Sequence, residues 1–383
     1  MQKHYLVITP FFPTVKSFRG PYVLDQVKAL QKTGKFSVVV LKPTLFYTRE
    51  LDYEYDGVKV FMFNVFNLPS YIFPGFFAKF SFKSLLSKLK KINIDINTIK
   101  IIHTHGTSNA YLANSIKLRN PEVKTILQHH GLDVLNINQG IFSKFKWYNR
   151  YIEKYGIKIC NKIDLHVGVS SKTLSYLKKY KNICIKNEYV LYNGVDLKKF
   201  YPTGNIKNNK YFNIGCIANF WALKDQITLL KAVKILNQNS KTSIKVKFIG
   251  SGETLDACKV FTSLNKLGEI VEFKKEVHHR ELVKFYNSLD LFVLPSYYEA
   301  FGCVYTEAYA CGVPFIGVEN QGISELIASS EKRKWLIEKS NAQQLSELID
   351  EYIRNKNEQV LTMDINIEIL IDKFIKYLRN NIL

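Results

Sequence analysis

The chain has no apolar run long enough to span a membrane, because no window reaches about 18 uninterrupted apolar residues. Its first ten residues, Met1 to Pro10, also lack the apolar core of a secretory signal. We therefore expect neither a signal peptide nor a transmembrane helix. Hydrophobic residues make up 46% of the 383 residues, which is enough for two domains with apolar cores.

Cysteine is also scarce. The six cysteines form no C-x-x-C pair and no zinc-binding spacing. This pattern is typical of reduced cysteines in the core of a cytoplasmic protein, and it argues against a disulfide framework or a structural zinc site. The cysteines are Cys160, Cys184, Cys216, Cys258, Cys303 and Cys311.

Acidic residues are few relative to basic ones, since 33 Asp and Glu face 54 Lys and Arg, for a formal net charge of +21. The excess lies in residues 1–196, which hold 29 basic and 12 acidic side chains. A basic half can bind nucleic acid, an anionic membrane or an acidic substrate. No helix-turn-helix, zinc finger or RNP motif is present, so we expect no nucleic-acid partner.

Residues 71–91 concentrate aromatic and basic side chains in the sequence YIFPGFFAKFSFKSLLSKLKK. This composition is typical of a helix that lies in the interface of an anionic membrane. An amphipathic helix with one face in the core and a lysine-rich face in solvent has the same pattern. Both interpretations stay open, and the first predicts peripheral binding to the inner face of the membrane.

Short apolar strands alternate with amphipathic helices along the chain, the pattern of parallel α/β sheets. The pattern restarts after a polar, turn-rich stretch at residues 193–209, which predicts two domains. The expected strands cover residues 5–9, 37–41, 58–63, 99–104, 125–128, 165–169 and 189–192, then 212–217, 245–249, 270–273, 291–294 and 314–318. The expected helices cover residues 22–32, 226–236, 255–267, 280–288, 304–310, 342–355 and 365–379.

The most informative segment is residues 295–326, which follow an apolar strand. Glu299 and Glu307, with seven residues between them, flank a Phe301-Gly302-Cys303 turn that opens a helix. A glycine turn before a helix binds anions, because backbone N–H groups and the helix dipole meet there. Glu307 lies about five residues into the helix, roughly 8 Å along its axis and close to the span from a diphosphate to its ribose. The segment predicts a sugar-nucleotide site.

Four segments in this order resemble glycosyltransferase family 4. They are QHHGLD at residues 128–133, LYNGVD at 191–196 with Phe200 following, FIGSGE at 248–253, and the segment 295–326 with EAFG, EAYACGVP and QGISEL. The resemblance implies the α/β GT-B fold, in which two facing Rossmann-like domains with parallel sheets enclose a cleft. It places the acceptor-side domain at residues 1–195, with the C-terminal helix 365–383 packing back on it, and the nucleotide-sugar domain at 196–364.

The activity implied by the resemblance is that of a retaining hexosyl- or N-acetylhexosaminyltransferase. The donor would be a nucleoside diphosphate sugar, with UDP expected, and the acceptor a saccharide or lipid-linked molecule in surface polysaccharide, lipopolysaccharide or glycolipid synthesis. The chain contains no D-x-D pair to hold a divalent metal. We therefore expect a metal-independent clamp of cationic side chains and helix N-termini, and no cofactor.

The resemblance also assigns the donor site residue by residue. Lys224 matches the diphosphate-binding lysine, and Asn219 stands where the family usually has an arginine, so that position brings no charge. Glu307 would accept hydrogen bonds from the ribose hydroxyls, and Glu299 would meet the donor sugar. The other expected donor-site residues are Gly20 beside the diphosphate, Gly250, Ser251 and Val277 beside the nucleobase, and the backbone amides of Phe301, Gly302, Cys303 and Val304.

His130 is the titratable group that the resemblance places at the donor sugar, and we name it a catalytic candidate together with Glu299 and Lys224. The acceptor-side candidates are Arg19, His103, His105 and Asp133. The H-x-H pair of His103 and His105 invites a zinc interpretation. No third ligand with suitable spacing accompanies the pair, so we expect no metal site.

Other classes share two α/β domains. A sugar-nucleotide epimerase or a phosphorylase is disfavoured by the NGVD and EAFG segments, and a dinucleotide oxidoreductase by the single G-x-G at Gly250 to Gly252 with Leu255 at the third glycine position. A catalytically weak membrane- or glycan-binding scaffold stays open, because Asn219 removes one expected cation. Release of nucleoside diphosphate from a sugar nucleotide would separate the enzyme from the scaffold.

Overall fold

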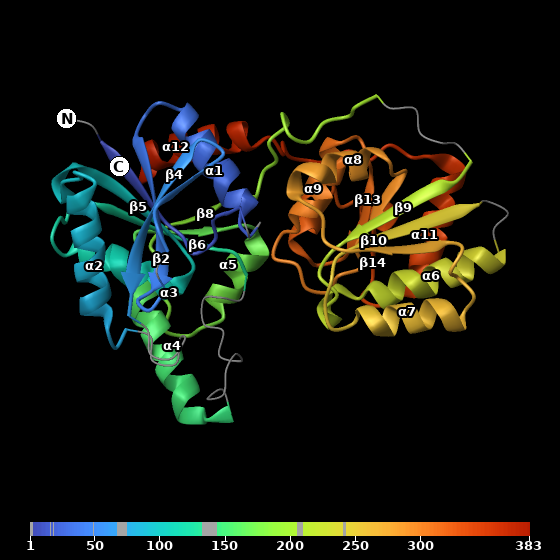
Figure 1. Cartoon of the computed structure of the whole chain (residues 1–383), viewed down its shortest axis with the longest axis horizontal. Coiled ribbons are helices and arrows are strands. Elements are labelled where there is room, and N and C mark those ends of the chain that lie inside the picture. The colour runs from blue at the N-terminus through green and yellow to red at the C-terminus, as the bar shows by residue number, and fades with distance from the viewer. Residues whose placement is uncertain are drawn as a thin grey trace. The chain divides into compact units, whose positions relative to one another are not determined.

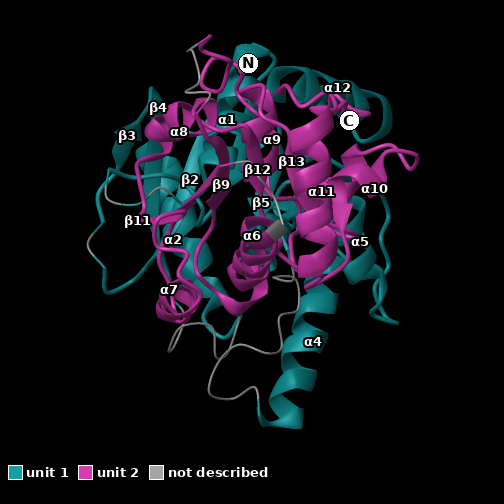
Figure 2. Cartoon of the chain, turned by 90° about the vertical axis from the view of Figure 1, so that its right-hand side faces the viewer, with its two compact units in different colours: residues 1–194, 367–383 teal, residues 195–366 magenta. Residues whose placement is uncertain are grey.

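The computed structural model describes residues 3–15, 17, 19–48, 50–66, 75–131, 144–204, 210–239 and 243–383. The chain divides into two compact units, shown in different colours in Figure 2. Unit 1 comprises residues 1–194 and 367–383, and unit 2 comprises residues 195–366. These limits lie within two residues of the domain limits expected from the sequence.

Unit 1 is built on an eight-stranded sheet in the part of the chain that the structure describes, with the order β3-β4-β2-β1-β5-β6-β7-β8. The strands pair in parallel, except that β3 runs antiparallel to β4. Their bounds are β1 His4–Ile8, β2 Ser37–Leu45, β3 Tyr53–Tyr55, β4 Val58–Val65, β5 Ile99–His105, β6 Lys124–His129, β7 Leu165–Gly168 and β8 Glu188–Val190. The strand order reverses between β1 and β5, so the loops that follow these two strands lie at a topological switch point.

Helices cover both faces of this sheet, and each face has its own apolar core. The C-terminal helix α12 packs beside α1, and its Phe374 contacts Tyr189 on β8 (Figure 1). The helix bounds are α1 Pro21–Lys32, α2 Ala78–Lys91, η1 Ile96–Thr98, α3 Thr107–Lys117, α4 Lys146–Cys160, α5 Ser171–Lys178 and α12 Ile367–Asn381. The terminal helix therefore belongs to unit 1.

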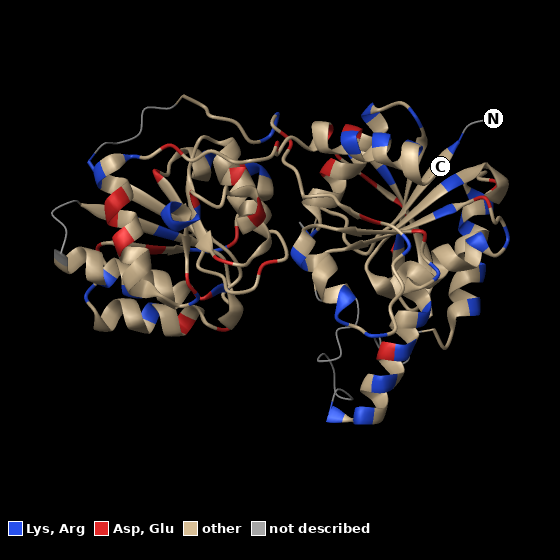
Figure 3. Cartoon of the chain, turned by 180° about the vertical axis from the view of Figure 1, so that it is seen from behind, with Lys and Arg blue, Asp and Glu red and all other residues tan. Residues whose placement is uncertain are grey.

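Helix α2 buries Leu85 and Leu89 in the core of unit 1, so the core-facing interpretation holds for this face of the helix. Phe80 on α2 and Phe76, which precedes the helix, are exposed at 55% and 76% of their surface. Residues 71–74 of the predicted membrane segment lie outside the described residues. Among the described helices, none combines the length and the apolar character needed to cross a membrane. Figure 3 colours the positions of Lys and Arg blue, and they are spread along the helices of unit 1.

Unit 2 contains a parallel sheet of six strands in its described part, with the order β11-β10-β9-β12-β13-β14. The strand bounds are β9 Phe212–Ile217, β10 Ile244–Ile249, β11 Val271–Lys274, β12 Leu291–Val293, β13 Phe315–Val318 and β14 Leu336–Ile337. The helix bounds are η4 Ala222–Lys224, α6 Gln226–Asn239, α7 Leu255–Leu264, η5 His279–Glu281, α8 Leu282–Asn287, α9 Cys303–Ala310, η6 Gly322–Leu326, α10 Lys332–Trp335 and α11 Ala342–Asn355. The order reverses between β9 and β12, and ligands of open α/β sheets bind at the carboxyl ends of strands at such a point.

Candidate functional site

The loops that follow β9 and β12 meet at the switch point of unit 2, and each supplies one charged side chain. Nζ of Lys224, at the end of η4, forms an ion pair with Oε1 of Glu299. Two further hydrogen bonds join the loops, from Oγ of Ser296 and from the backbone N–H of Tyr297 to the carbonyl of Leu223, at 3.0 and 3.1 Å. The two residues that the sequence assigned to diphosphate and sugar therefore lie side by side.

Gly250, at the end of β10, allows the loop after β9 to lie against the neighbouring strand. Its φ is +147°, and a Cβ atom at this position would stand 2.0 Å from the carbonyl oxygen of Ala218. Any other residue would push the loop away from the strand. Ser251 follows, and its Oγ donates to Oε1 of Glu276 at 2.6 Å. Val277, the other residue expected beside a nucleobase, is partly buried in the loop after β11.

Glu307 lies five residues into α9 and is only 7% exposed. The Tyr286 hydroxyl donates to its Oε2 at 2.9 Å, and Nε2 of His279 donates to its Oε1 at 3.1 Å. Burial and the neighbouring Glu307 carboxylate raise the pKa of Tyr286 well above its ordinary value, so this phenol stays a proton donor. A carboxylate offers about four acceptor positions, so Glu307 keeps the capacity to accept from two further hydroxyls.

The turn before α9 is held by the segment around η6. The backbone N–H of Glu299 donates to Oε1 of Gln321 at 2.9 Å, and the N–H of Gly322 donates to the carbonyl of Glu299 at 3.2 Å. Gly302 is the N-cap residue of α9, with φ of +87°, and the helix begins at Cys303. Phe301 is buried, so its side chain belongs to the core and only its backbone remains a candidate for ligand contact. Val304 lies in the first turn of α9.

Asn219 is exposed in the loop after β9, where its carbonyl accepts a hydrogen bond from Nε2 of Gln226 at 3.0 Å. Its amide side chain brings no positive charge to this edge of the sheet. The cation of the described loop after β9 is therefore Lys224, whose charge is already shared with Glu299.

Three of the predicted residues of unit 1, His103, His105 and His130, lie at the carboxyl ends of β5 and β6. The rings of His103 and His105 stack with centroids 4.7 Å apart, and those of His105 and His130 stack at 5.0 Å. Nδ1 of His105 and Nε2 of His130 are 2.8 Å apart and share one hydrogen bond. At the other end, the Tyr5 hydroxyl is 2.8 Å from Nδ1 of His103.

Burial keeps these histidines uncharged at neutral pH. It lowers the pKa of His130 to about 3, and burial together with the nearby His130 lowers the pKa of His103 to about 3. The pKa of His105 is likewise well below its ordinary value, first through burial and then through the two neighbouring rings. His103 is completely buried, which corrects its expected place on an acceptor-facing surface. A neutral imidazole acts here as a hydrogen-bonding group rather than as a cation.

Gly20, at the N-terminus of α1, is required by the close approach of the loop after β1. Its φ is +89°, and a Cβ atom would stand 2.4 Å from the carbonyl oxygen of Phe11. The ring of Phe11 in this loop and the ring of Tyr22 at the start of α1 lie 5.9 and 5.0 Å from the ring of His130. Arg19 is exposed, and Asp133 lies outside the described residues.

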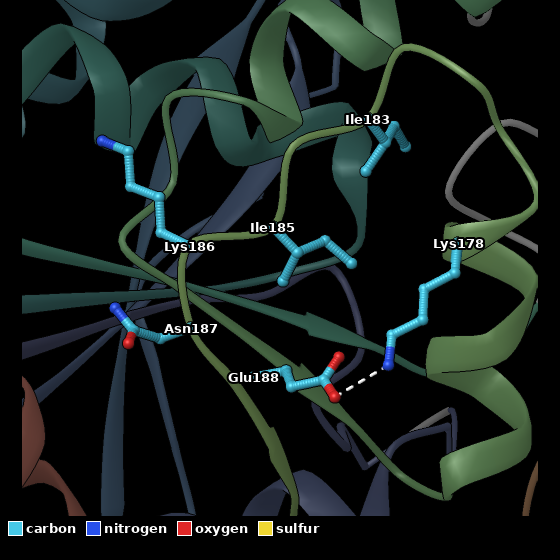
Figure 4. Close-up of a pocket in the computed structure, with 6 residues that line it drawn as sticks. All are labelled: Lys178, Ile183, Ile185, Lys186, Asn187 and Glu188. Carbon is cyan, nitrogen blue, oxygen red and sulfur yellow. Dashed lines mark hydrogen bonds and ion pairs between the residues drawn. The ribbon is translucent and has the colours of Figure 1, made fainter.

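Two cavities that are lined by described residues lie away from these residues. A cavity of about 420 Å³ in unit 1 is lined by Lys178 and Glu188, which form a 2.8 Å ion pair (Figure 4). A cavity of about 740 Å³ in unit 2 lies near the start of β9, between Tyr211 and Tyr352. In parallel sheets the ligand lies at the carboxyl ends, so we place the site at Lys224, Glu299 and Glu307 instead.

Metal ligands do not gather anywhere in the described residues, where no group of three or more His, Cys, Asp or Glu side chains could hold an ion. All six cysteines are free thiols, and Cys160, Cys216, Cys258 and Cys311 are buried as expected. Burial raises the pKa of Cys311 to about 12, which makes it an inert core residue.

Sequence reasoning missed the residues that hold Glu307. His279 and Tyr286 precede it by 28 and 21 positions and belong to a different loop and helix. No local pattern marks either of them, because their relation to Glu307 comes from the packing of α8 against α9.

Two family profiles match most of the chain. The profile of Glycosyl transferases group 1 matches residues 198–366, and that of Glycosyltransferase Family 4 matches residues 20–199. The chain therefore belongs to the glycosyltransferases that these two profiles describe, with Glycosyltransferase Family 4 matching its first half and Glycosyl transferases group 1 its second half.

Curated relatives and a solved structure agree with this assignment. The chain is 27% identical to the capsular polysaccharide biosynthesis glycosyltransferase CapM of Staphylococcus aureus, over 43% of this chain and 44% of CapM. It therefore spans less than half the length of that relative. It is 25% identical to the UDP-Gal:alpha-D-GlcNAc-diphosphoundecaprenol alpha-1,3-galactosyltransferase of Escherichia coli, over 73% of this chain and 71% of that protein. Anabaena HepE, solved with UDP, superposes with a TM-score of 0.70 at 13% identity, covering 99% of this chain and 100% of HepE. The fold is GT-B, as expected.

Proposed function

We propose that the protein is a retaining glycosyltransferase that moves a hexose or N-acetylhexosamine from a nucleoside diphosphate sugar to a saccharide or lipid-linked acceptor. The observation that carries the proposal is the placement of Lys224, Glu299 and Glu307 at one sheet edge, where the strand order of unit 2 reverses. Open α/β sheets bind nucleotides at such an edge.

Each group has a task that its chemistry suits. Lys224 neutralises the diphosphate, Glu307 accepts from the ribose hydroxyls, and Glu299 accepts from hydroxyls of the transferred sugar. Glu307 is suited to binding the ribose in a fixed position, because Tyr286 and His279 hold both of its carboxylate oxygens in place. Gly250, Ser251 and Val277 border the base, and the amides that open α9 approach the sugar and phosphates.

UDP is the proposed nucleotide. The Escherichia coli relative is named for a UDP-sugar donor, and HepE was solved with UDP. We propose that no metal takes part, because Lys224 and the N-terminus of α9 supply the positive field that a divalent ion would otherwise provide.

The proposed reaction keeps the configuration at the anomeric carbon. The bond between that carbon and the diphosphate oxygen breaks, and the acceptor hydroxyl forms the new bond on the same face. The hydroxyl proton passes to the departing diphosphate, so no protein group must carry it. His130 is assigned to the transferred sugar, as the resemblance implies, and acts there as a neutral hydrogen-bonding group.

We further propose that the acceptor is held at an anionic membrane surface by unit 1. The support is the aromatic patch, which we define as Phe46, Tyr47, Phe66, Phe76, Phe77 and Phe80 and whose rings are linked by contacts of 4.9 to 6.0 Å. Lys79 and Lys83 are exposed on α2 beside it. Aromatic rings next to lysines suit the boundary between acyl chains and anionic headgroups.

The test is the release of nucleoside diphosphate from UDP-glucose, UDP-galactose, UDP-N-acetylglucosamine and GDP-mannose, with and without extracted lipid acceptors and with EDTA present. We expect release from one of the UDP-sugars that increases with acceptor, with an α-linked product from an α-linked donor by NMR. Lys224→Gln should abolish it. Absence of release from every donor, or an inverted product, would overturn the proposal.

A further inference from the structure

The hydrogen bond between His105 and His130 couples the tautomers of the two rings, so the donor of this bond determines which nitrogen of His130 carries a proton. Neutral imidazole has one N–H and one bare nitrogen, so exactly one of the two bonded nitrogens is the donor. If Nδ1 of His105 donates, His130 is protonated on Nδ1. If Nε2 of His130 donates, its Nδ1 is bare. The two arrangements present opposite hydrogen-bonding groups to a ligand.

Nothing in the described part of the chain pairs with Nε2 of His105 or with Nδ1 of His130, although both atoms are buried. One of them must carry the second N–H. A permanently buried N–H without an acceptor is rarer in proteins than a buried acceptor without a donor. His105 is only 1% exposed at the end of β5, so an N–H on its Nε2 would stay unpaired, whereas His130 follows β6 and is only partly buried, which leaves its ring within reach of a ligand.

A neighbouring pair of histidines follows the same rule. Nε2 of His166 is 3.1 Å from the carbonyl oxygen of Cys160, which can only accept, so His166 is protonated on Nε2. Its bare Nδ1 then accepts from Nε2 of His129 at 3.0 Å. The remaining buried atom without a described partner, Nδ1 of His129, is therefore bare rather than an N–H.

We infer that His105 is a positioning residue that donates from Nδ1 to Nε2 of His130 and thereby makes His130 an Nδ1–H donor for an oxygen of the bound sugar nucleotide. His103 stacks on His105, and the rings of Phe11 and Tyr22 contact the ring of His130. These contacts fix the orientation of the His130 ring and therefore the direction of its N–H. The identity of the ligand rests on the proposed function, whereas the tautomer of His130 can be tested whatever ligand the protein binds.

The experiment is long-range ¹H–¹⁵N NMR of the full chain with ¹⁵N-labelled histidine, with His130 assigned by His130→Gln. We expect His130 protonated on Nδ1, while His129 and His166 are protonated on Nε2 in the same spectrum. Replacing His105 by Phe keeps a stacked ring but removes the donor, so His130 should lose the Nδ1–H preference. His105→Asn, whose amide can donate near the former Nδ1, should restore it.

The rate of sugar transfer provides a second test of the inference. His105→Phe should lower kcat for sugar transfer about tenfold while nucleoside diphosphate affinity stays unchanged, because one hydrogen bond is lost and the base and ribose bind unit 2. Tyr5→Phe removes the bond to His103 but not that to His130, so it should leave the His130 signals unchanged. Protonation of His130 on Nε2 in the wild type, or an unchanged tautomer in His105→Phe, overturns the inference. Failure of every donor to react would overturn the proposed function alone.

Discussion

Lys224 and Glu299, 75 positions apart in the sequence, form an ion pair that joins the loops after β9 and β12. Both side chains are mostly buried, so the pair is poorly screened by solvent. A diphosphate that approaches Lys224 competes with Glu299 for the same ammonium group. The proposed donor site thus contains an internal anion that a bound phosphate must partly displace.

This competition predicts opposite effects of Glu299→Gln on binding and on transfer. UDP should bind about threefold more tightly, because Lys224 is no longer neutralised. Transfer should fall by about tenfold or more, because the sugar loses a charged acceptor. Titration calorimetry with UDP and steady-state kinetics measure the two effects. Glu276→Gln is the control, since Glu276 is bonded to Ser251 and not to Lys224, and weaker UDP binding in Glu299→Gln would contradict the account.

Asn219→Arg restores the cation that the family usually carries at this position. Because Asn219 is exposed and its backbone contact to Gln226 does not involve the side chain, the substitution should leave the fold intact. We expect UDP affinity to rise about threefold at low salt and the gain to shrink as salt is added. Asn219→Gln is the neutral control. Equal affinities for the two variants at low salt would show that this position does not face the phosphates.

The buried histidines predict loss of stability in mild acid. Burial lowers the pKa of His103 and His130 to about 3 and that of His166 to about 4, from an ordinary value of 6.5. The unfolded chain therefore binds more protons than the folded one between these values. Stability is complete above pH 6.5 and falls as pH decreases towards 4, by up to about 1.4 kcal/mol per pH unit for each histidine.

Urea unfolding between pH 7.5 and 5 measures this slope. His166→Gln keeps an amide N–H for the Cys160 carbonyl but removes one titrating group, so its slope should be shallower. A flat profile in the wild type would mean that these rings take up protons as readily in the folded protein as in the unfolded chain.

The aromatic patch predicts binding to anionic vesicles. Replacing Phe76 and Phe80 together by Ser should weaken binding by at least about tenfold, because two exposed rings no longer enter the interface. The matched control replaces Val260 and Leu264, which are 57% and 78% exposed on α7 of unit 2. Co-sedimentation with vesicles at low salt compares the two. Equal binding by both double variants would show that the aromatic patch does not contribute to vesicle binding.

The sequence predicted most strands and the division into two units, because apolar runs and turn residues are local signals. It did not predict β3, since three residues that pair antiparallel with β4 are too short to show a period. It also gave no sign of β14, which has two residues.

The sequence predicted which residues belong to the candidate site, but it did not predict their contacts with one another. Glu299 and Glu307 are visible in one segment, but the partners Lys224, His279 and Tyr286 depend on which strands are neighbours in the sheet. His103 and His105 alternate on one strand, so a shared face was predictable. Their stack with His130 required the register that sets His105 opposite Gln128.

The central claim is best tested by titration calorimetry of UDP, GDP, ADP and CMP, with and without EDTA, on the wild type, Lys224→Gln and Glu307→Gln. The account predicts that UDP binds most tightly, that EDTA has no effect, and that each substitution weakens binding by about tenfold or more. Folding of each variant is checked by its thermal midpoint. Binding that needs a metal, or that both variants retain at full strength, would contradict a nucleotide site at the carboxyl edge of the unit 2 sheet.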